Sequence, residues 1–167
     1  MKPTPYNQIG ILILIIIFLI SASCKKEHLP DYYFKCKVNG QEYIPDNCAN
    51  CLTAKLLGDT LLILGANRYV EYVVLGILDF PLQAKTYYLD STRTYGGGGT
   101  AFYDNTIGNP SDIFRTDSLR TGKFIISTLD KTNKSISGTF YFEAFNSIQD
   151  KTVKITDGKF RLQYKTY

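Results

Sequence analysis

Short apolar runs that end at tight turns recur along this chain and constrain its fold more than any other feature. Asn39-Gly40 and Asp157-Gly158 favour two-residue hairpin turns, in which both turn residues adopt positive φ angles. Gly58-Asp59 marks a third turn, and the runs between turns are rich in Tyr, Phe and Thr. No helical period of convincing length appears. The pattern predicts an all-β domain.

The individual strands follow from these runs. Strands are predicted over residues 52–57, 60–66, 72–78, 84–89, 122–129 and 135–145, with hairpins over 32–44 and 153–164. Residues 90–121 are the least regular part, with brief pairing at 100–103 and a flexible glycine loop at 96–99. The continuous apolar runs at 61–64 and within 72–78 suit strands in the middle of a sandwich. We therefore expect an antiparallel β-sandwich of about ten short strands, with an up-and-down, lipocalin-like barrel as the alternative.

Two of the turns also predict a strand register. A two-residue turn at Asn39-Gly40 places Cys36 opposite Tyr43, with Val38 and Lys37 opposite Gln41 and Glu42. The same reasoning at Asp157-Gly158 places Ile155 opposite Phe160 and Val153 opposite Leu162. In residues 135–145, alternation turns Ile136, Phe140, Phe142 and Ala144 to one face of the sheet.

The N-terminal segment predicts where the domain is located. Residues 9–20 are apolar apart from Gly10, Lys2 puts positive charge ahead of them, and small residues follow at 21–23. This order is typical of a secretory signal peptide. The apolar run is shorter than the roughly 20 residues that span a bilayer. We expect export of the chain.

Cys24 directly follows the small residues and resembles the cysteine of a bacterial lipobox, which is lipidated and becomes the first residue of the mature protein. Ser21 departs from the motif, where Leu is usual. A plain secretory signal, leaving an ordinary thiol, and an uncleaved anchor helix are the alternatives. The residue after Cys24 is Lys25, whereas an Asp at this position would resemble an inner-membrane retention signal. Lys25 therefore favours a lipid anchor in the outer membrane, on the periplasmic face or the cell surface. The predicted organisation is a signal peptide at 1–23, a tether at 24–31 and a single β-sandwich domain at 32–167.

Three stretches of the predicted domain resemble a known group of proteins. Residues 36–41, 136–142 and 153–160 are similar to a family of small Bacteroidota lipoproteins with a β-rich domain of unknown function. The resemblance implies an envelope location and a β fold. Its motifs are turn and strand motifs, so it implies no catalytic or binding residue.

The cysteines are candidates for a disulfide bond. With Cys24 lipidated, Cys36, Cys48 and Cys51 remain in an oxidising compartment. A bridge from Cys36 to Cys48 or Cys51 would join the first hairpin to the following loop and leave one free thiol. A redox pair at Cys48 and Cys51, a zinc site formed by the three thiols and His28, three free thiols and an intermolecular bridge remain as alternatives.

Exposed tyrosines suggest glycan binding, because aromatic faces stack on sugar rings. Tyr87, Tyr88, Tyr95 and Tyr103, in and near the irregular region, are the candidates, with core packing as the alternative.

Three further residues are candidates for O-glycosylation. Thr60, Ser91 and Ser118 each follow an aspartate, in triplets that resemble the glycosylation sites of exported Bacteroidota proteins. Ser91 and Ser118 lie in loop-like sequence and are better placed than Thr60.

Metal binding and catalysis have little support in the sequence. Asp104, Asn105, Asn109 and Asp112 offer oxygen ligands for calcium, but their spacing matches no EF-hand loop. The one histidine, His28, lies in the tether, so no Ser-His-Asp or Cys-His arrangement can form inside the domain. We expect no metal, no cofactor and no enzymatic activity.

The remaining function classes are binding and structural roles. The net charge of +4 is modest and the basic residues are scattered, which argues against nucleic-acid binding. We expect a non-catalytic binding or interaction module in the cell envelope, attached to the membrane by its N-terminal lipid and recognising an envelope protein or a glycan. A structural accessory subunit of an envelope complex and a glycan-active enzyme are the alternatives.

Overall fold

The computed structural model describes residues 31–167 apart from 49, 68–70, 80, 91–97 and 106–111. The described residues form eleven strands and no α-helix. None of their segments is a helix long and apolar enough to cross a membrane. The predicted signal peptide, Cys24 and all but the last residue of the predicted tether lie outside the described residues.

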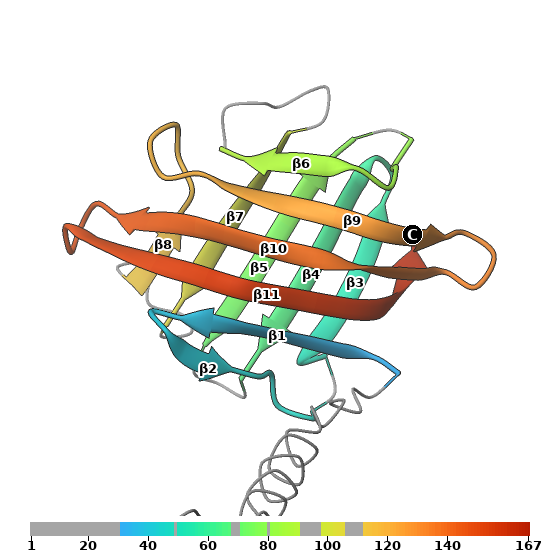
Figure 1. Ribbon diagram of the computed structural model, residues 1–167, viewed down its shortest axis with the longest axis horizontal. Coiled ribbons are helices and arrows are strands. Elements are labelled where there is room, and N and C mark those ends of the chain that lie inside the picture. The colour runs from blue at the N-terminus through green and yellow to red at the C-terminus, as the bar shows by residue number, and fades with distance from the viewer. Residues whose placement is uncertain (1–30, 49, 68–70, 80, 91–97, 106–111) are drawn as a thin grey trace, which may run out of the picture.

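The strands form two layers whose directions cross (Figure 1). The first layer contains β2 (Gln41–Tyr43), β1 (Tyr33–Val38), β11 (Lys151–Thr166), β10 (Ser135–Asn146), β9 (Gly122–Asp130) and β6 (Thr86–Leu89). The second layer contains β3 (Leu52–Leu57), β4 (Thr60–Ala66), β5 (Tyr72–Leu78), β7 (Gly98–Asp104) and β8 (Ile113–Arg115). The predicted all-β fold is confirmed, with its strands in two facing layers.

The two layers are hydrogen-bonded to each other along both edges. On one side the C-terminal end of β11 leaves the first layer and pairs in parallel with β3. On the other side β6 pairs in parallel with β7, and β8 pairs with both β7 and β10. From β11 the order of paired strands leads through the second layer and back through β6, β9 and β10 to β11. The fold is therefore closed, as the barrel alternative predicted. The two parallel pairings are departures from the predicted antiparallel arrangement.

Several strands match the prediction closely. The first hairpin has the predicted register, including Cys36 opposite Tyr43, and Asn39 and Gly40 have the positive φ angles (49° and 85°) that its turn requires. β3 and β4 have the predicted bounds, on either side of the turn at Gly58. At these positions the turn residues and the alternation of side chains were sufficient to predict the strand bounds and the register.

The predicted hairpin at Asp157-Gly158 is wrong. Both residues lie inside the continuous strand β11, which pairs with β1 on one side and with β10 on the other. Asp157 has a φ of 54° and both ladders shift register beside it, which defines a β-bulge. Ile155 consequently pairs with Phe142 rather than with Phe160. Because β1 and β10 pair with β11 on both sides of Asp157, the strand continues through the bulge and does not turn back on itself.

The region predicted to be irregular holds two strands. Gly98 and Gly99 are buried in β7 and do not belong to a flexible loop. A Cβ atom on Gly99 would lie 2.6 Å from the Ile77 side chain and 2.7 Å from the Gly76 carbonyl oxygen, so only glycine fits between β5 and the side chains of the core. The three-residue strand β8 was not predicted, because so short a run carries no period.

An aromatic cluster fills the space between the layers. Phe124 and Phe160 stack with ring centroids 5.0 Å apart, and Phe34 and Phe140 pack at 4.9 Å. All four rings are at most 2% exposed. They come from β9, β11, β1 and β10, so the first layer supplies these rings, and leucine, isoleucine and valine side chains of β4 and β5 face them. The predicted inward face of β10 is confirmed by the burial of Ile136, Phe140, Phe142 and Ala144.

Candidate functional site

A hollow of about 220 Å³ lies at one end of the two layers. Four stretches of chain line it: the end of β3 with its turn, the segment after β5, the end of β9 with its turn, and the end of β11. Leu56, Pro81, Leu82 and Leu129 form an apolar wall. Ends of β-barrels and barrel-like folds are common sites of ligand binding, which makes this hollow the candidate site.

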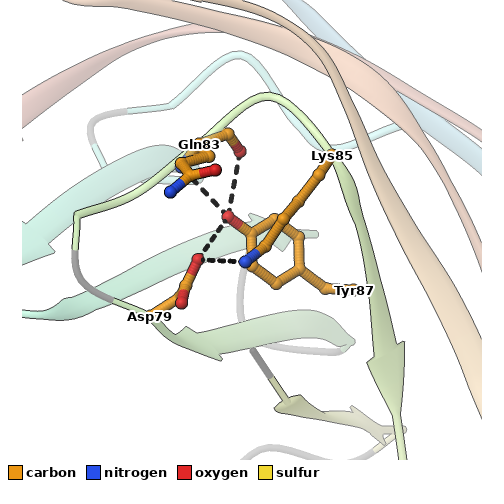
Figure 2. A network of polar contacts seen from close by, with 4 residues as sticks. All are labelled: Asp79, Gln83, Lys85 and Tyr87. Carbon is orange, nitrogen blue, oxygen red and sulfur yellow. Dashed lines mark hydrogen bonds and ion pairs between the residues drawn. The ribbon is translucent and has the colours of Figure 1, made fainter. Parts of the chain in front are cut away.

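A polar network holds one side of the hollow in place (Figure 2). The Tyr87 hydroxyl lies 2.9 Å from Asp79 Oδ2 and 2.9 Å from the Gln83 carbonyl oxygen, both of which can accept its proton. The Gln83 backbone N–H donates to the same hydroxyl over 3.1 Å. Lys85 Nζ pairs with Asp79 Oδ2 at 2.8 Å. The network therefore fixes and neutralises the carboxylate of Asp79, which lines the hollow.

The Tyr87 ring anchors this network in the core. The residue is fully buried, and Lys85 Nζ lies 5.0 Å from the ring centroid, within the range of a cation–π interaction. Burial raises the pKa of Tyr87 to about 12, and the hydrogen bond and charge of Asp79 raise it as well. The hydroxyl is thus neutral at physiological pH and can donate to the carboxylate.

Tyr164 is the second polar group of the hollow. Its backbone N–H donates to the Lys134 carbonyl oxygen over 2.8 Å, and the residue is 6% exposed. Among the described residues its hydroxyl has no hydrogen-bond partner, in contrast to that of Tyr87. Burial raises the pKa of Tyr164, with a further contribution from the negative charge of Asp130. The hydroxyl oxygen is not among the buried polar atoms without a partner, so it reaches the hollow and is available to water or to a ligand.

Lys131 completes the hollow. It lies in the turn after β9, its side chain is exposed, and it forms no ion pair with a described residue. The hollow thus combines an apolar wall with an unused hydroxyl and an unpaired ammonium group, while its carboxylate is already neutralised by Lys85. This combination suits the binding of a small amphiphilic molecule rather than proton transfer.

The structure places the candidate tyrosines in different environments. Tyr87 and Tyr103 are 0% and 5% exposed, so the prediction that their faces stack on sugars is wrong. Tyr103 points into the core, where its hydroxyl donates to Glu71 Oε1 over 2.6 Å. Tyr88 is 46% exposed on the outer face of β6, and Tyr95 lies outside the described residues. Alternation along β6 places neighbouring tyrosines on opposite faces.

The cysteine pairing also differs from the prediction. Cys48 and Cys51 are joined to each other, in a turn where the Cys51 N–H donates to the Cys48 carbonyl oxygen over 3.1 Å. Cys36 is a free thiol, because β1 directs it into the core at 3% exposure. Burial raises its pKa to about 12, and the nearby charge of Glu71 contributes. The expected bridge from Cys36 is therefore wrong, and His28, the remaining ligand of the alternative zinc site, lies outside the described residues.

The candidate calcium residues are not gathered into a site. Asp104 is 7% exposed in β7, Asp112 accepts a hydrogen bond from the Gln149 side chain, and Asn109 lies outside the described residues. The described part of the chain contains no group of three or more His, Cys, Asp or Glu residues placed to hold a metal ion.

The candidate glycosylation sites stay predictions. Ser118 is exposed in a turn where Asp117 Oδ1 accepts the backbone N–H groups of Leu119 and Arg120 at 2.7 and 2.6 Å. Thr60 is the first residue of β4 and is partly buried, and Ser91 lies outside the described residues.

Sequence reasoning did not find the hollow. The predicted elements at 52–57, 72–78, 122–129 and 153–164 all end beside the hollow, but nothing in their sequences indicates that these four ends meet. An unpartnered hydroxyl is visible only once the surrounding chain is in place.

Comparison with curated proteins and with solved structures finds no significant match. The model of one protein family, DUF6252, described as a domain of unknown function, matches residues 32–162, which include almost the whole described β domain. The chain therefore belongs to the DUF6252 family.

Proposed function

We propose that this chain is a lipid-anchored protein of the bacterial outer membrane, and that its β domain is a non-catalytic module that binds a small amphiphilic ligand. The anchor is supported by the apolar run at 9–20 and the lipobox-like position of Cys24. From Cys24 to the start of β1 at Tyr33 the chain spans at most about 30 Å, at roughly 3.3–3.6 Å per extended residue. Such a tether keeps the domain close to the bilayer.

The anchor is tested by metabolic labelling with a fatty-acid probe in a bacterial host. The unmodified chain incorporates the probe and fractionates with outer membranes, and Cys24→Ala abolishes both. Cys36→Ala, which removes a buried thiol of the domain, is the matched control and keeps the label. Label that persists in Cys24→Ala contradicts the anchor.

The unpartnered Tyr164 hydroxyl beside an apolar wall is the observation that carries the ligand proposal. The hollow of about 220 Å³ corresponds to about seven waters at roughly 30 Å³ each, which is smaller than the roughly 300–1,000 Å³ of drug-sized sites. A short alkyl chain or the end of a longer one fits this space. Donation by Tyr164 and the positive charge of Lys131 favour a head group that accepts hydrogen bonds and carries negative charge, such as a carboxylate.

A set of ligands with equal chain length tests this proposal. Octanoate, octanol and octylamine are titrated into isotopically labelled protein, and amide chemical shifts are followed by NMR. We expect octanoate to bind most tightly and octylamine most weakly, with shifts concentrated at Leu82, Leu129 and the end of β11. Equal binding of all three contradicts the assigned head group, and shifts elsewhere contradict the assigned site.

Two variants separate the parts of the hollow. Tyr164→Phe keeps the ring and removes the hydroxyl, so it should weaken octanoate binding several-fold without altering the fold. Leu82→Trp fills the apolar space and should abolish binding. Lys55→Ala removes a positive charge from β3 at a residue that does not line the hollow, and it should leave the affinity unchanged.

A further inference from the structure

The outer face of the first layer is a polar surface quite unlike the aromatic core beneath it. Alternation along β11 turns Lys154, Lys159 and Arg161 outward, opposite the buried side chains. The carboxylates of Glu143 and Asp157 on this face are already paired, with Lys154 and Lys37 respectively, at 2.8 Å.

Three cations of this face have no carboxylate partner. Lys123, Lys159 and Arg161 form no ion pair with a described residue. The carboxylates of Glu143 and Asp157 are occupied. Among the described residues, the carboxylates of this face without an ion pair, Asp31 beside the groove and Glu42 on β2, are fewer than these three cations, so the charge left available is positive. The face therefore complements an acidic ligand.

A groove of about 270 Å³ runs into this face beside the start of β1. Hydroxyl groups, a guanidinium group and an aromatic ring line it, supplied by Thr128, Ser135, Ser137, Arg161 and Tyr32, together with the carboxylate of Asp31. Ser137 lies directly opposite Arg161 on β11 and opposite Thr128 on β9, so these three side chains form one row across the sheet. The Tyr32 ring is 45% exposed.

A second row on the same face presents two tyrosines. Tyr141 pairs with Lys123, which pairs with Tyr88, and the two tyrosines are 45% and 46% exposed. Lys123 Nζ lies 5.6 Å from the centroid of the Tyr88 ring. Two strand spacings separate the tyrosines by roughly 10 Å, and the row lies about 13 Å along β10 from Ser137. Several sugar units of one chain could span both rows.

We propose that this face binds an acidic polysaccharide, with one charged sugar unit in the groove beside β1. Arg161 pairs with a carboxylate of that unit, and the hydroxyls of Ser137 and Thr128 exchange hydrogen bonds with its hydroxyl groups. Tyr141 and Tyr88 offer ring faces to units further along, where Lys123 meets a second carboxylate. The groove lacks the deep apolar pockets that anchor peptides, which favours a sugar chain.

This surface is separate from the hollow, since the two share no lining residue. Polysaccharide binding by this face depends on the proposed function only for the envelope location and does not depend on the hollow. Failure of octanoate binding would leave it intact, and its own failure would leave the hollow intact.

The test uses the full lipidated chain in a non-ionic detergent, with polygalacturonate as the probe. Methyl-esterified polygalacturonate has the same sugar backbone without the charge and serves as the matched ligand. We expect binding to polygalacturonate that is at least about 10-fold tighter than binding to the ester and that weakens as salt is raised. Equal binding to the ester overturns the charge assignment.

Variants locate the site on the face. Arg161→Ala should weaken binding about 10-fold and Tyr141→Ala several-fold, whereas Lys55→Ala, on the other layer, should have no effect. All three positions are at the surface, so circular dichroism should report an unchanged fold. Lys55→Ala as damaging as Arg161→Ala would mean attraction by net charge alone and overturn the site. Binding to micelles that contain phosphatidylglycerol, without binding to polygalacturonate, would replace the polysaccharide with a lipid head group and overturn the proposal.

Discussion

Removing one hydroxyl at a time from Tyr87 and Tyr164 should separate a structural tyrosine from a ligand-binding one. The Tyr87 hydroxyl receives one hydrogen bond from Gln83 and donates to Asp79 or to the Gln83 carbonyl. A net hydrogen bond to a charged group contributes about 1.5–3 kcal/mol. Asp79 keeps its ion pair with Lys85, and Gln83 is exposed to water, so we take the lower end. Tyr87→Phe should therefore lower the free energy of unfolding by about 1.5 kcal/mol.

Tyr164→Phe removes a hydroxyl without a protein partner and should change stability by less than about 0.5 kcal/mol. Urea unfolding followed by circular dichroism measures both variants. With an m value of about 1.5 kcal/mol/M, Tyr87→Phe should lower the midpoint by about 1 M. Equal losses in the two variants would refute the assignment of Tyr164, and an unchanged midpoint in Tyr87→Phe would refute the network.

Three further predictions concern the core and the titrating groups. Gly138→Ala would place a Cβ atom much closer to the Ile125 backbone carbonyl oxygen than van der Waals contact allows and should prevent folding, whereas Gly76→Ala, whose Cβ would meet its nearest neighbour at an ordinary contact distance of 3.5 Å, should express as folded protein. Cys36, whose pKa is raised to about 12, should not react with Ellman's reagent at pH 8 until urea unfolds the chain; rapid reaction of the native protein would place the thiol outside the core. Tyr87 has a pKa raised to about 12 in the folded state, so its contribution to stability is complete below the unfolded value of about 10 and is lost as the pH rises through 12; a stability curve over this range should flatten in Tyr87→Phe.

Local signals in the sequence were reliable where one physical rule acts alone. Asn39-Gly40 forms the predicted turn because, among the described strands, none pairs with β2 on its other side and competes with the hairpin. Asp157-Gly158 carries the same signal and forms a bulge, because β1 and β10 both pair with β11 across it. A dipeptide therefore specifies a local backbone conformation, while the neighbouring strands decide whether the chain turns.

Long-range features could not be predicted from the sequence. Tyr87 and Tyr88 are neighbours in β6 with identical side chains, so the sequence does not tell which of them is buried. The position of β6 beside β9 decides that Tyr87 faces the core. The predicted register of the first hairpin placed Cys36 opposite the aromatic Tyr43, which was a usable signal against its expected disulfide. The hollow depends on closure of the ladder by β11 and β3, and no local pattern encodes that closure. Both proposed binding surfaces thus emerged only with the complete fold.

The most direct test of the central claim is a search for contacts between bound octanoate and the hollow. Intermolecular nuclear Overhauser effects should connect the octanoate methylene protons with the methyl groups of Leu56, Leu82 and Leu129 and with the Tyr164 ring. In Tyr164→Phe the same contacts should appear only at higher ligand concentration. Contacts at any other surface, or saturating octanoate without contacts to these leucines, would contradict the account.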